Sequence, residues 1–285
     1  MSILERPEWL KRVLPAGEYF SDTERLLQEH HVNTVCQSAH CPNIGECFSA
    51  KTATFMILGT NCTRRCRFCT VGKEEPSPVD SEEAMRVRQA AQEMGLQYVV
   101  ITSVTRDDLP DGGSHVFSQC IQELRQYCPE TQVEVLIPDF QGNSEAIDTV
   151  LSAGPDVLNH NIETVPRLYS LVRPEANYQR SLTLLKTSSQ QGKMKVKSGI
   201  MVGLGETKEE IFDVLNDLKR HGVDFVTIGQ YLRPSEKHLP IDRYVTPEEF
   251  SEYGKKALEI GFSAVASGPF VRSSYQAARM MKEKA

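Results

Sequence analysis

The sequence predicts an α/β fold, a partial (β/α)6 TIM-like barrel whose parallel strands are covered by helices. Two observations predict it: short apolar runs recur along the chain, and segments with helical periodicity lie between them. Six such strand–helix units are too few to close an eight-stranded barrel, so we expect an open one. The predicted strands are residues 54–58, 97–102, 133–137, 157–161, 196–201 and 225–228.

The remaining elements follow in chain order. Residues 1–50 are expected to form an irregular N-terminal extension in which only residues 22–29 have a helical pattern. Residues 51–260 are expected to form the barrel. A helix is predicted over 81–94, with Ser81 as its N-cap and with Glu82 and Glu83 as acidic residues that stabilise its first turn. Further helices are expected over 116–127 and over 206–220, where Gly222 follows the end. A last strand over 263–266 lies in the C-terminal extension, residues 261–285.

Composition sets broad limits on the function. The chain has 285 residues, 40% hydrophobic and 25% charged, which predicts a globular protein with room for one large α/β domain. Its net charge of −6 argues against a nucleic-acid partner. No apolar run approaches the roughly 20 residues of a membrane span, and the start of the chain lacks a secretory apolar core. We therefore expect a cytoplasmic protein whose eight cysteines are reduced and serve as metal ligands rather than in disulfides.

The most informative feature is a CxxxCxxC run, formed by Cys62, Cys66 and Cys69. A [4Fe–4S] cluster normally takes four thiolates, so three of them predict a cluster with one iron open to a ligand from outside the protein. S-adenosylmethionine could chelate that iron through its amino and carboxylate groups and be cleaved by an electron to a 5′-deoxyadenosyl radical. The spacing, with an aromatic residue just before the last cysteine, resembles the radical SAM superfamily.

A structural zinc site is the alternative reading of this run. Such sites want four tetrahedral ligands at paired spacings, and no histidine lies within the loop. Arg64 and Arg65, inside the run, either offset the negative charge of a thiolate cluster or form a solvated basic turn.

A second cysteine set precedes the first, with the spacing CxxxxCxxxxxC. Turn-forming residues between its last two members predict a loop wrapped around a group rather than a strand or helix. His40 is a poor candidate for a fourth ligand, because it is so close in sequence to Cys41 that it would struggle to reach the same iron. The set comprises Cys36, Cys41 and Cys47, whereas the remaining thiols, Cys120 and Cys128, resemble ordinary packing cysteines.

The pairing of the two sets, some fifteen residues apart, resembles the lipoyl synthase family of radical SAM proteins. Further segments that resemble family motifs cover nearly the whole chain: 53–58, 105–113, 135–140, 160–165, 203–207, 230–235 and 268–275. The resemblance implies two [4Fe–4S] clusters and S-adenosylmethionine as cofactors. It also implies that a serine of the motif at 272–275 is the fourth ligand of the second cluster, with Ser274 preferred and Ser273 the alternative. From the residues alone, both serines would be read as turn or capping residues.

The activity that the resemblance implies is the insertion of two sulfur atoms at C6 and C8 of an octanoyl chain. The chain would be carried on a lysine of a lipoyl carrier domain, as in 2-oxoacid dehydrogenase E2 subunits or the glycine cleavage H protein. The second cluster would be consumed as the sulfur donor, so an iron–sulfur carrier is a further expected partner. A flavodoxin or ferredoxin would supply the electrons, and an apolar channel would accept the octanoyl chain.

Polar residues at the expected strand ends are candidates for binding S-adenosylmethionine, because barrel chemistry gathers there. Asn161 and Glu163 alternate and so face the same side, where they could hold the two ribose hydroxyls. The other candidates are Gln230 and Arg233 for adenosine or substrate, and Arg173 and Lys197 for the methionine carboxylate or substrate. Each of the latter pair could instead be an ordinary surface charge.

Two other functions compete with this reading. A sulfur-inserting enzyme of the biotin synthase type would need its second cluster bound within the barrel, whereas the extra thiols here lie on the N-terminal extension. A non-catalytic iron–sulfur sensor or carrier would leave the polar strand ends around Asn161, Glu163 and Gln230 without a purpose.

Overall fold

A computed structural model describes residues 5–11, 18–38, 41, 43–49 and 53–282, so His40 lies outside the described residues. Its internal contacts divide the chain into two compact units. The N-terminal unit contains Leu14–Arg65 and Thr70–Asn159, and the C-terminal unit contains Met1–Val13, Cys66–Cys69 and His160–Ala285. The division predicted from sequence, at residues 50 and 260, stays a prediction.

The N-terminal unit is built on a sheet whose strands follow one another in chain order. Strand β2 pairs in parallel with β3, β3 with β4 and β4 with β5, and the short β1 pairs with β2 in the antiparallel direction. All four residues of β2 are buried, as parallel strands covered on both faces should be. The strands are β1 (Asn33–Thr34), β2 (Thr54–Ile57), β3 (Tyr98–Ser103), β4 (Gln132–Leu136) and β5 (Val157–Asn159).

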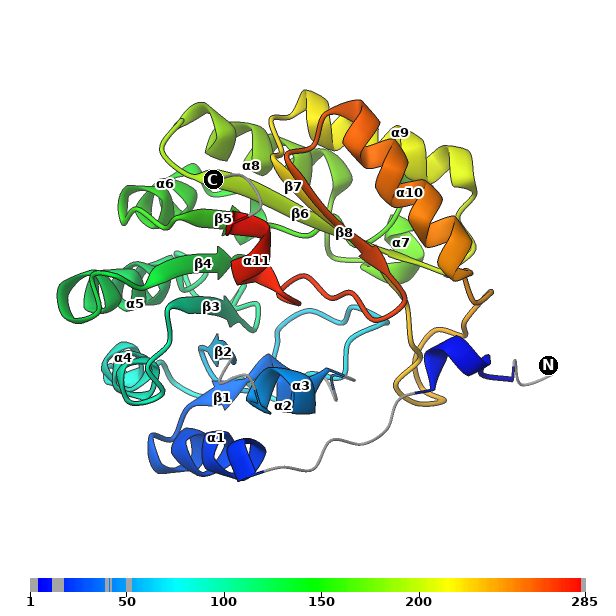
Figure 1. Ribbon diagram of the computed structural model, residues 1–285. Coiled ribbons are helices and arrows are strands. Elements are labelled where there is room, and N and C mark those ends of the chain that lie inside the picture. Colours follow the sequence, from blue (N-terminus) through cyan, green and yellow to red (C-terminus); the bar gives the residue numbers. More distant parts are fainter. Residues whose placement is uncertain (1–4, 12–17, 39–40, 42, 50–52, 283–285) are drawn as a thin grey trace. The chain divides into compact units, whose positions relative to one another are not determined.

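Three helices of this unit, α4, α5 and α6, pack against each other in a row beside the strands (Figure 1). The inward face of α5 carries Phe117, Cys120 and Leu124, all wholly buried, so Cys120 is a packing cysteine as predicted. The helical elements are α1 (Glu18–Glu29), α2 (Val35–Ser38), α3 (Ile44–Ser49), α4 (Glu83–Glu93), α5 (Ser114–Tyr127), η2 (Phe140–Gly142) and α6 (Ser144–Ser152).

Two local predictions for this unit are wrong. The N-terminal extension is not irregular, because α2 contains Cys36 and α3 contains Cys47. Asn43 directly precedes α3, a position that turn-forming residues also favour, which is why the segment looked like a loop. Ser81 is not the N-cap of α4 either, since Glu82 occupies that position.

The C-terminal unit repeats the same pattern, with β6 parallel to β7 and β7 parallel to β8. Helices α8, α9 and α10 bury apolar residues that join those of the strands in one core cluster. Its elements are η1 (Glu8–Leu10), η3 (Pro166–Leu168), α7 (Tyr169–Val172), α8 (Tyr178–Gln190), β6 (Lys195–Val202), α9 (Lys208–Arg220), β7 (Phe225–Gln230), α10 (Pro247–Ile260), β8 (Ala264–Gly268) and α11 (Ala277–Lys282).

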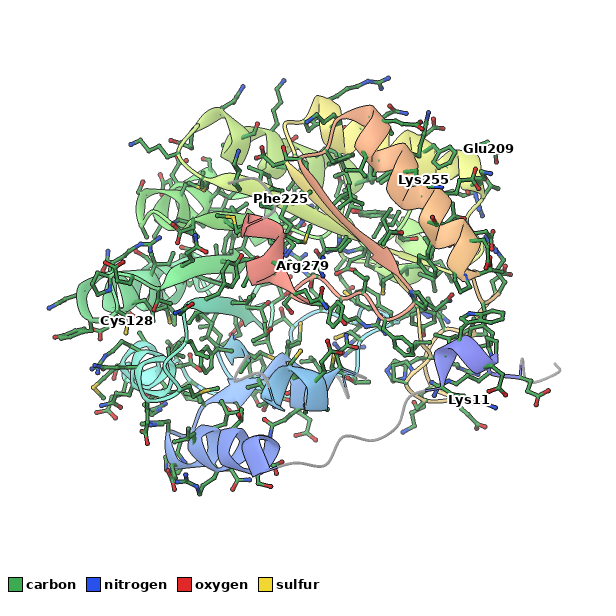
Figure 2. The ribbon with its side chains drawn as sticks, in the orientation of Figure 1. Lys11, Cys128, Glu209, Phe225, Lys255 and Arg279 are labelled. Atoms are coloured by element: carbon green, nitrogen blue, oxygen red, sulfur yellow. The ribbon has the colours of Figure 1, made fainter. Side chains whose placement is uncertain are left out.

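Helices α9 and α10 lie side by side in this unit (Figure 1). Phe225 at the start of β7 is buried, whereas Glu209 on α9 and Lys255 on α10 are exposed (Figure 2). All six predicted strands and the final one are present, which confirms the predicted α/β alternation. Among the described helices, none is long and apolar enough to cross a membrane.

Helix α10 begins with a complete capping box, which fixes where the chain turns after β7. Thr246 Oγ1 accepts from Glu249 N at 3.3 Å, and the Glu249 carboxylate accepts from Thr246 N at 3.0 Å. We expect Thr246→Ala to lower the free energy of unfolding by about 1 kcal/mol. Urea unfolding followed by circular dichroism measures this, with Ser251→Ala on the exposed side of the same helix as control; equal midpoints for the two variants would contradict it.

Candidate functional site

The first half of the CxxxCxxC loop belongs to the N-terminal unit and follows β2. Cys62 N donates to Gly72 O at 2.8 Å, and Thr63 N donates to Thr105 O at 3.0 Å. Thr105 N in turn points at the Cys62 sulfur, at an N···Sγ distance of 3.3 Å. Backbone N–H groups directed at cysteine sulfur are a feature of iron–sulfur sites, where they tune the reduction potential. This part of the loop therefore fits a thiolate that ligates iron.

Arg64 anchors the same half of the loop by a buried ion pair. Only 3% of Arg64 is exposed, and its guanidinium donates to Asp107 at 2.7 and 3.0 Å and to Asp139 at 2.5 Å. Burial alone would lower the pKa of Arg64, but the hydrogen bonds to the two carboxylates outweigh it and raise the pKa. Arg64 is therefore not a solvated turn residue, and its predicted role in offsetting the charge of a thiolate cluster stays a prediction.

The second half of the loop belongs to the C-terminal unit. Cys69 N donates to Cys66 O at 3.2 Å, and Arg67 N donates to Val172 O at 2.9 Å, at the end of α7. The segment after β7 holds it from another direction, because Leu239 N donates to Arg67 O at 3.2 Å and His238 Nε2 lies 3.2 Å from Cys69 O. The sequence did not suggest that His238 contacts the cysteine loop. Its only sequence signal was its place just after the 230–235 motif.

The second cysteine set lies entirely in the N-terminal unit. Cys41 N donates to Cys36 O at 3.0 Å, and Cys47 N donates to Asn43 O at 3.0 Å, so short-range backbone bonds shape the segment. Burial and, to a smaller extent, the charge of the nearby Cys41 raise the pKa of Cys36 to about 11. Both thiols would ionise together only with a bound cation or cluster to offset the repulsion between the two thiolates.

No three His, Cys, Asp or Glu side chains among the described residues converge as the ligands of one metal ion would. The cysteine spacing suits a cluster better than a single ion, because each thiolate of a [4Fe–4S] cluster ligates a different iron.

Asn161 and Glu163 follow β5 and face the same side, as predicted. Asn161 Nδ2 donates to Glu163 Oε1 at 3.1 Å. Glu163 has a left-handed backbone with φ +68°, and its N and O bond to Gly199 and Met201 of β6. Burial raises the pKa of Glu163, while Arg173, Asn161 and Arg272 oppose that shift.

Asn161 offers an acceptor with no partner among the described residues, because its Oδ1 is buried and makes no hydrogen bond. It lies beside Gly199 on β6, where a Cβ would stand 2.9 Å from Asn161 Oδ1 and 2.6 Å from Thr227 Oγ1. The missing side chain lets Asn161 and Thr227 approach the β6 backbone closely, and the unbonded Oδ1 of Asn161 is an acceptor that fits the predicted contact with a ribose hydroxyl.

Arg173 and Lys197 are not surface charges. Arg173 is 9% exposed and its Nη1 donates to Asn161 O at 2.8 Å and to Ile162 O at 3.3 Å, so it supports the backbone of the candidate ribose site. Lys197, on β6, is 1% exposed. Arg173 therefore lies beside the residues proposed to hold the ribose. Direct contact of Arg173 or Lys197 with a cofactor remains a prediction.

Gln230 has its amide fully engaged with backbone. Its Nε2 lies 3.0–3.1 Å from the carbonyl oxygens of Val202, Tyr231 and Arg243, and its Oε1 accepts from Val245 N at 2.8 Å. The side chain packs where Gly203, with φ +96°, leaves room, since a Cβ there would lie 2.2 Å from Gln230 Nε2. This arrangement supports a positioning role and does not support the predicted contact with adenosine. Arg233 likewise donates to carbonyls of its own loop, those of Glu236 and His238.

The two serines of the C-terminal motif lie half-buried in a turn before α11. Tyr275 N donates to Arg272 O at 3.0 Å and Ala277 N to Ser274 O at 3.4 Å, which closes the turn. Arg272 is near enough to Glu163 to lower its pKa, which brings this motif to the candidate ribose site of the same unit. Ligation by Ser274 or Ser273 remains a prediction.

Comparison with known proteins decides the family. Residues 56–218 match the model of the Radical SAM superfamily. The lipoyl synthase of Caldanaerobacter subterraneus subsp. tengcongensis is 57% identical over 96% of both chains, and that of Rubrobacter xylanophilus is 54% identical over 95% of this chain and 85% of the other. The chain belongs to the lipoyl synthase family. As a lipoyl synthase family member it is a radical SAM enzyme, so the alternatives of a biotin synthase type and of a non-catalytic carrier are wrong.

Solved structures confirm the predicted fold class, an open α/β barrel. The chain resembles Streptococcus suis SuiB bound to the precursor peptide SuiA, with a TM-score of 0.59 and 11% identity over 87% of this chain and 52% of that one. It also resembles HydG, a maturase of the [FeFe]-hydrogenase, with a TM-score of 0.54 and 15% identity over 93% and 74% of the two chains. Membership in this family implies a [4Fe–4S] cluster and S-adenosylmethionine as cofactors, and a lipoyl carrier as substrate.

The close approach of Asn161 to Gly199 can be tested by adding a side chain at this glycine. We expect Gly199→Ala to weaken S-adenosylmethionine binding about tenfold, because the added methyl group must displace Asn161 or Thr227. Equilibrium dialysis with the reconstituted protein measures the dissociation constant. Gly254→Ala in α10 is the control, since a Cβ there meets Ser267 at 3.3 Å; equal affinities of the two variants would remove Asn161 from the site.

Proposed function

We propose that the chain inserts two sulfur atoms, at C6 and C8, into an octanoyl chain carried on a lysine of a lipoyl carrier domain. An auxiliary [4Fe–4S] cluster held by Cys36, Cys41, Cys47 and Ser274 is the sulfur donor. The observation that carries this proposal is the presence of two cysteine triads on one chain of the lipoyl synthase family. One triad meets the need for a radical source and the other the need for sulfur.

The residues divide into two sets of roles. Cys62, Cys66 and Cys69 hold the cluster that, with S-adenosylmethionine bound, supplies the 5′-deoxyadenosyl radical needed to break an unactivated C–H bond. Asn161 and Glu163 hold the ribose hydroxyls, an assignment supported by the buried acceptor of Asn161 and the carboxylate beside it. Arg173 fixes the backbone on which both stand.

Serine suits the fourth position of an auxiliary cluster that is consumed. An alkoxide is a harder ligand for iron than a thiolate and exchanges more readily. The half-buried position of Ser274, in a turn rather than in a helix, is compatible with this role.

The partners in this proposal are those that membership in the lipoyl synthase family implies. The substrates are octanoylated carrier domains of 2-oxoacid dehydrogenase E2 subunits and of the glycine cleavage H protein. A flavodoxin or ferredoxin supplies electrons, and an iron–sulfur carrier renews the auxiliary cluster. Thiolate-bound clusters and a low-potential donor favour the reducing cytoplasm as the compartment.

The proposal is tested by anaerobic reconstitution of the protein with iron and sulfide. Reductant, S-adenosylmethionine and an octanoyl-lysyl peptide are added, and the peptide is followed by mass spectrometry. Gain of two sulfur atoms together with 5′-deoxyadenosine supports the proposal. Formation of 5′-deoxyadenosine without any sulfur gain on octanoyl peptides or intact octanoyl carrier domains would overturn it.

A further inference from the structure

The chain leaves β2 for the cluster loop through two consecutive residues with left-handed backbone. Leu58 has φ +67° and Gly59 has φ +90°. Leucine avoids this region because its Cβ approaches the backbone, at a cost that glycine does not carry. The strained turn lies three residues before Cys62, so its direction decides where the loop begins.

A buried carboxylate holds this turn. Leu58 N donates to Glu83 Oε2 at 2.8 Å, and Gly59 N also bonds to Glu83. Two successive backbone N–H groups in such a turn form a concave anion site, which the carboxylate occupies here. Glu83 is the first residue of α4, is 9% exposed and turns inward, whereas its neighbour Glu82 is exposed.

The residues around the turn pack against this left-handed conformation. The Leu58 side chain is 3% exposed and occupies space that Gly113 leaves free, since a Cβ on Gly113 would lie 2.3 Å from Leu58 Cδ1. Arg106 Nη1 lies 3.4 Å from Leu58 O. The surroundings thus select the left-handed turn, and Glu83 is the group that satisfies its N–H donors.

We propose that Glu83 is a positioning residue for the cluster loop, fixing the Leu58–Gly59 turn so that Cys62 is held ready for iron. The inference rests on the proposed use of Cys62, Cys66 and Cys69 as cluster ligands. Nothing in the sequence pattern suggests it, because Glu83 has the ordinary place of an acidic residue in the first turn of a helix.

The charge of Glu83 is buried at the turn, where Leu58 N donates to its carboxylate. Burial raises the pKa of this carboxyl despite the backbone hydrogen bonds that oppose the shift, so holding it ionised at neutral pH costs stability. Glu83→Gln has nearly the same shape without the charge. We therefore expect this variant to melt no lower than the parent protein while its cluster loop loosens.

Amide hydrogen exchange on the full-length apo protein tests the proposal without any cluster or substrate. We expect Glu83→Gln to speed exchange at Leu58 and Gly59 about fivefold, and Glu83→Ala about tenfold or more, because hydrogen bonds to charged acceptors are stronger than those to neutral ones. Amides of α5 should keep the parent rate. Glu82→Gln, on the exposed neighbour, is the matched control and should change neither.

A second variant tests the turn independently of Glu83. Gly59→Ala adds a methyl group that meets nothing within 4 Å, so it strains only the left-handed backbone. In both Gly59→Ala and Glu83→Gln we expect faster alkylation of Cys62, measured by mass spectrometry, relative to Cys128 in the same molecules. Faster alkylation would support the proposal even if the protein failed to insert sulfur.

Two results would overturn the inference. One is unchanged exchange at residues 58–63 and unchanged alkylation of Cys62 in Glu83→Ala. The other is uniformly faster exchange across α4, α5 and the strands in Glu83→Ala, together with a lower melting temperature of that variant. This result would make Glu83 a general packing residue. Neither result bears on sulfur insertion, so this inference and the proposed function fail separately.

Discussion

Replacing Cys41 with alanine is expected to abolish sulfur transfer to the octanoyl peptide while 5′-deoxyadenosine is still formed. Cys41 belongs to the second cysteine set and is close enough to Cys36 for their charges to interact. Loss of one of its few ligands should deprive the auxiliary cluster of a stable site, so sulfur gain falls at least roughly a hundredfold. The radical source, which uses Cys62, Cys66 and Cys69, is untouched.

The measurement is a time course of both products by mass spectrometry, with iron content determined for each variant. Cys66→Ala should remove both products, because the radical is then never formed. Cys128→Ala is the matched control, since this partly buried thiol follows α5 and belongs to neither set. Normal sulfur transfer by Cys41→Ala would assign the sulfur to another source.

Replacing Asp139 with alanine is expected to destabilise the protein by about 3 kcal/mol or more. Asp139 is wholly buried, and its carboxylate accepts from Arg64, which is buried as well. Removing one partner of a buried pair leaves a charge poorly compensated, which typically costs 3–5 kcal/mol. Asp107 still binds Arg64, so we expect the lower end of that range.

Urea unfolding of the apo protein measures this effect. Asp107→Ala is the matched comparison, because Asp107 binds the same guanidinium but its side chain is 21% exposed, and water can replace part of its contribution. We expect a smaller loss for that variant. Equal and small losses, below about 1 kcal/mol, would show that Arg64 is not held by these carboxylates in solution.

Much of the fold was predictable because the strands are buried on both faces and therefore appear as continuous apolar runs. Residues 54–58 and 225–228, for example, correspond to β2 and β7. The N-terminal extension was not predictable in the same way. Its helices α2 and α3 have four and six residues, too short for a periodic pattern to emerge.

The candidate site divides similarly. The cysteines could be proposed as cluster ligands from spacing alone, because ligation of one cluster demands thiols at short intervals. The roles of polar residues were harder to predict, as Gln230 shows: both ends of the amide that could bind adenosine are hydrogen-bonded to backbone instead. Sequence names the donor and acceptor, but their partners come from segments distant in the chain.

The sequence by itself determined the family of this protein and supplied its candidate cluster ligands, through six cysteines in two triads and motifs spread over nearly the whole chain. Only the tertiary structure decided which charged residues serve the loop that carries that chemistry. Arg64 pairs with Asp139, 75 residues away, and Glu83 bonds to Leu58, 25 residues away. The residues of a compact motif are close in the sequence, so their spacing can be read directly from it. A buried charge, in contrast, needs a partner because folding removes it from water, and that partner comes from a distant segment that only the fold brings near.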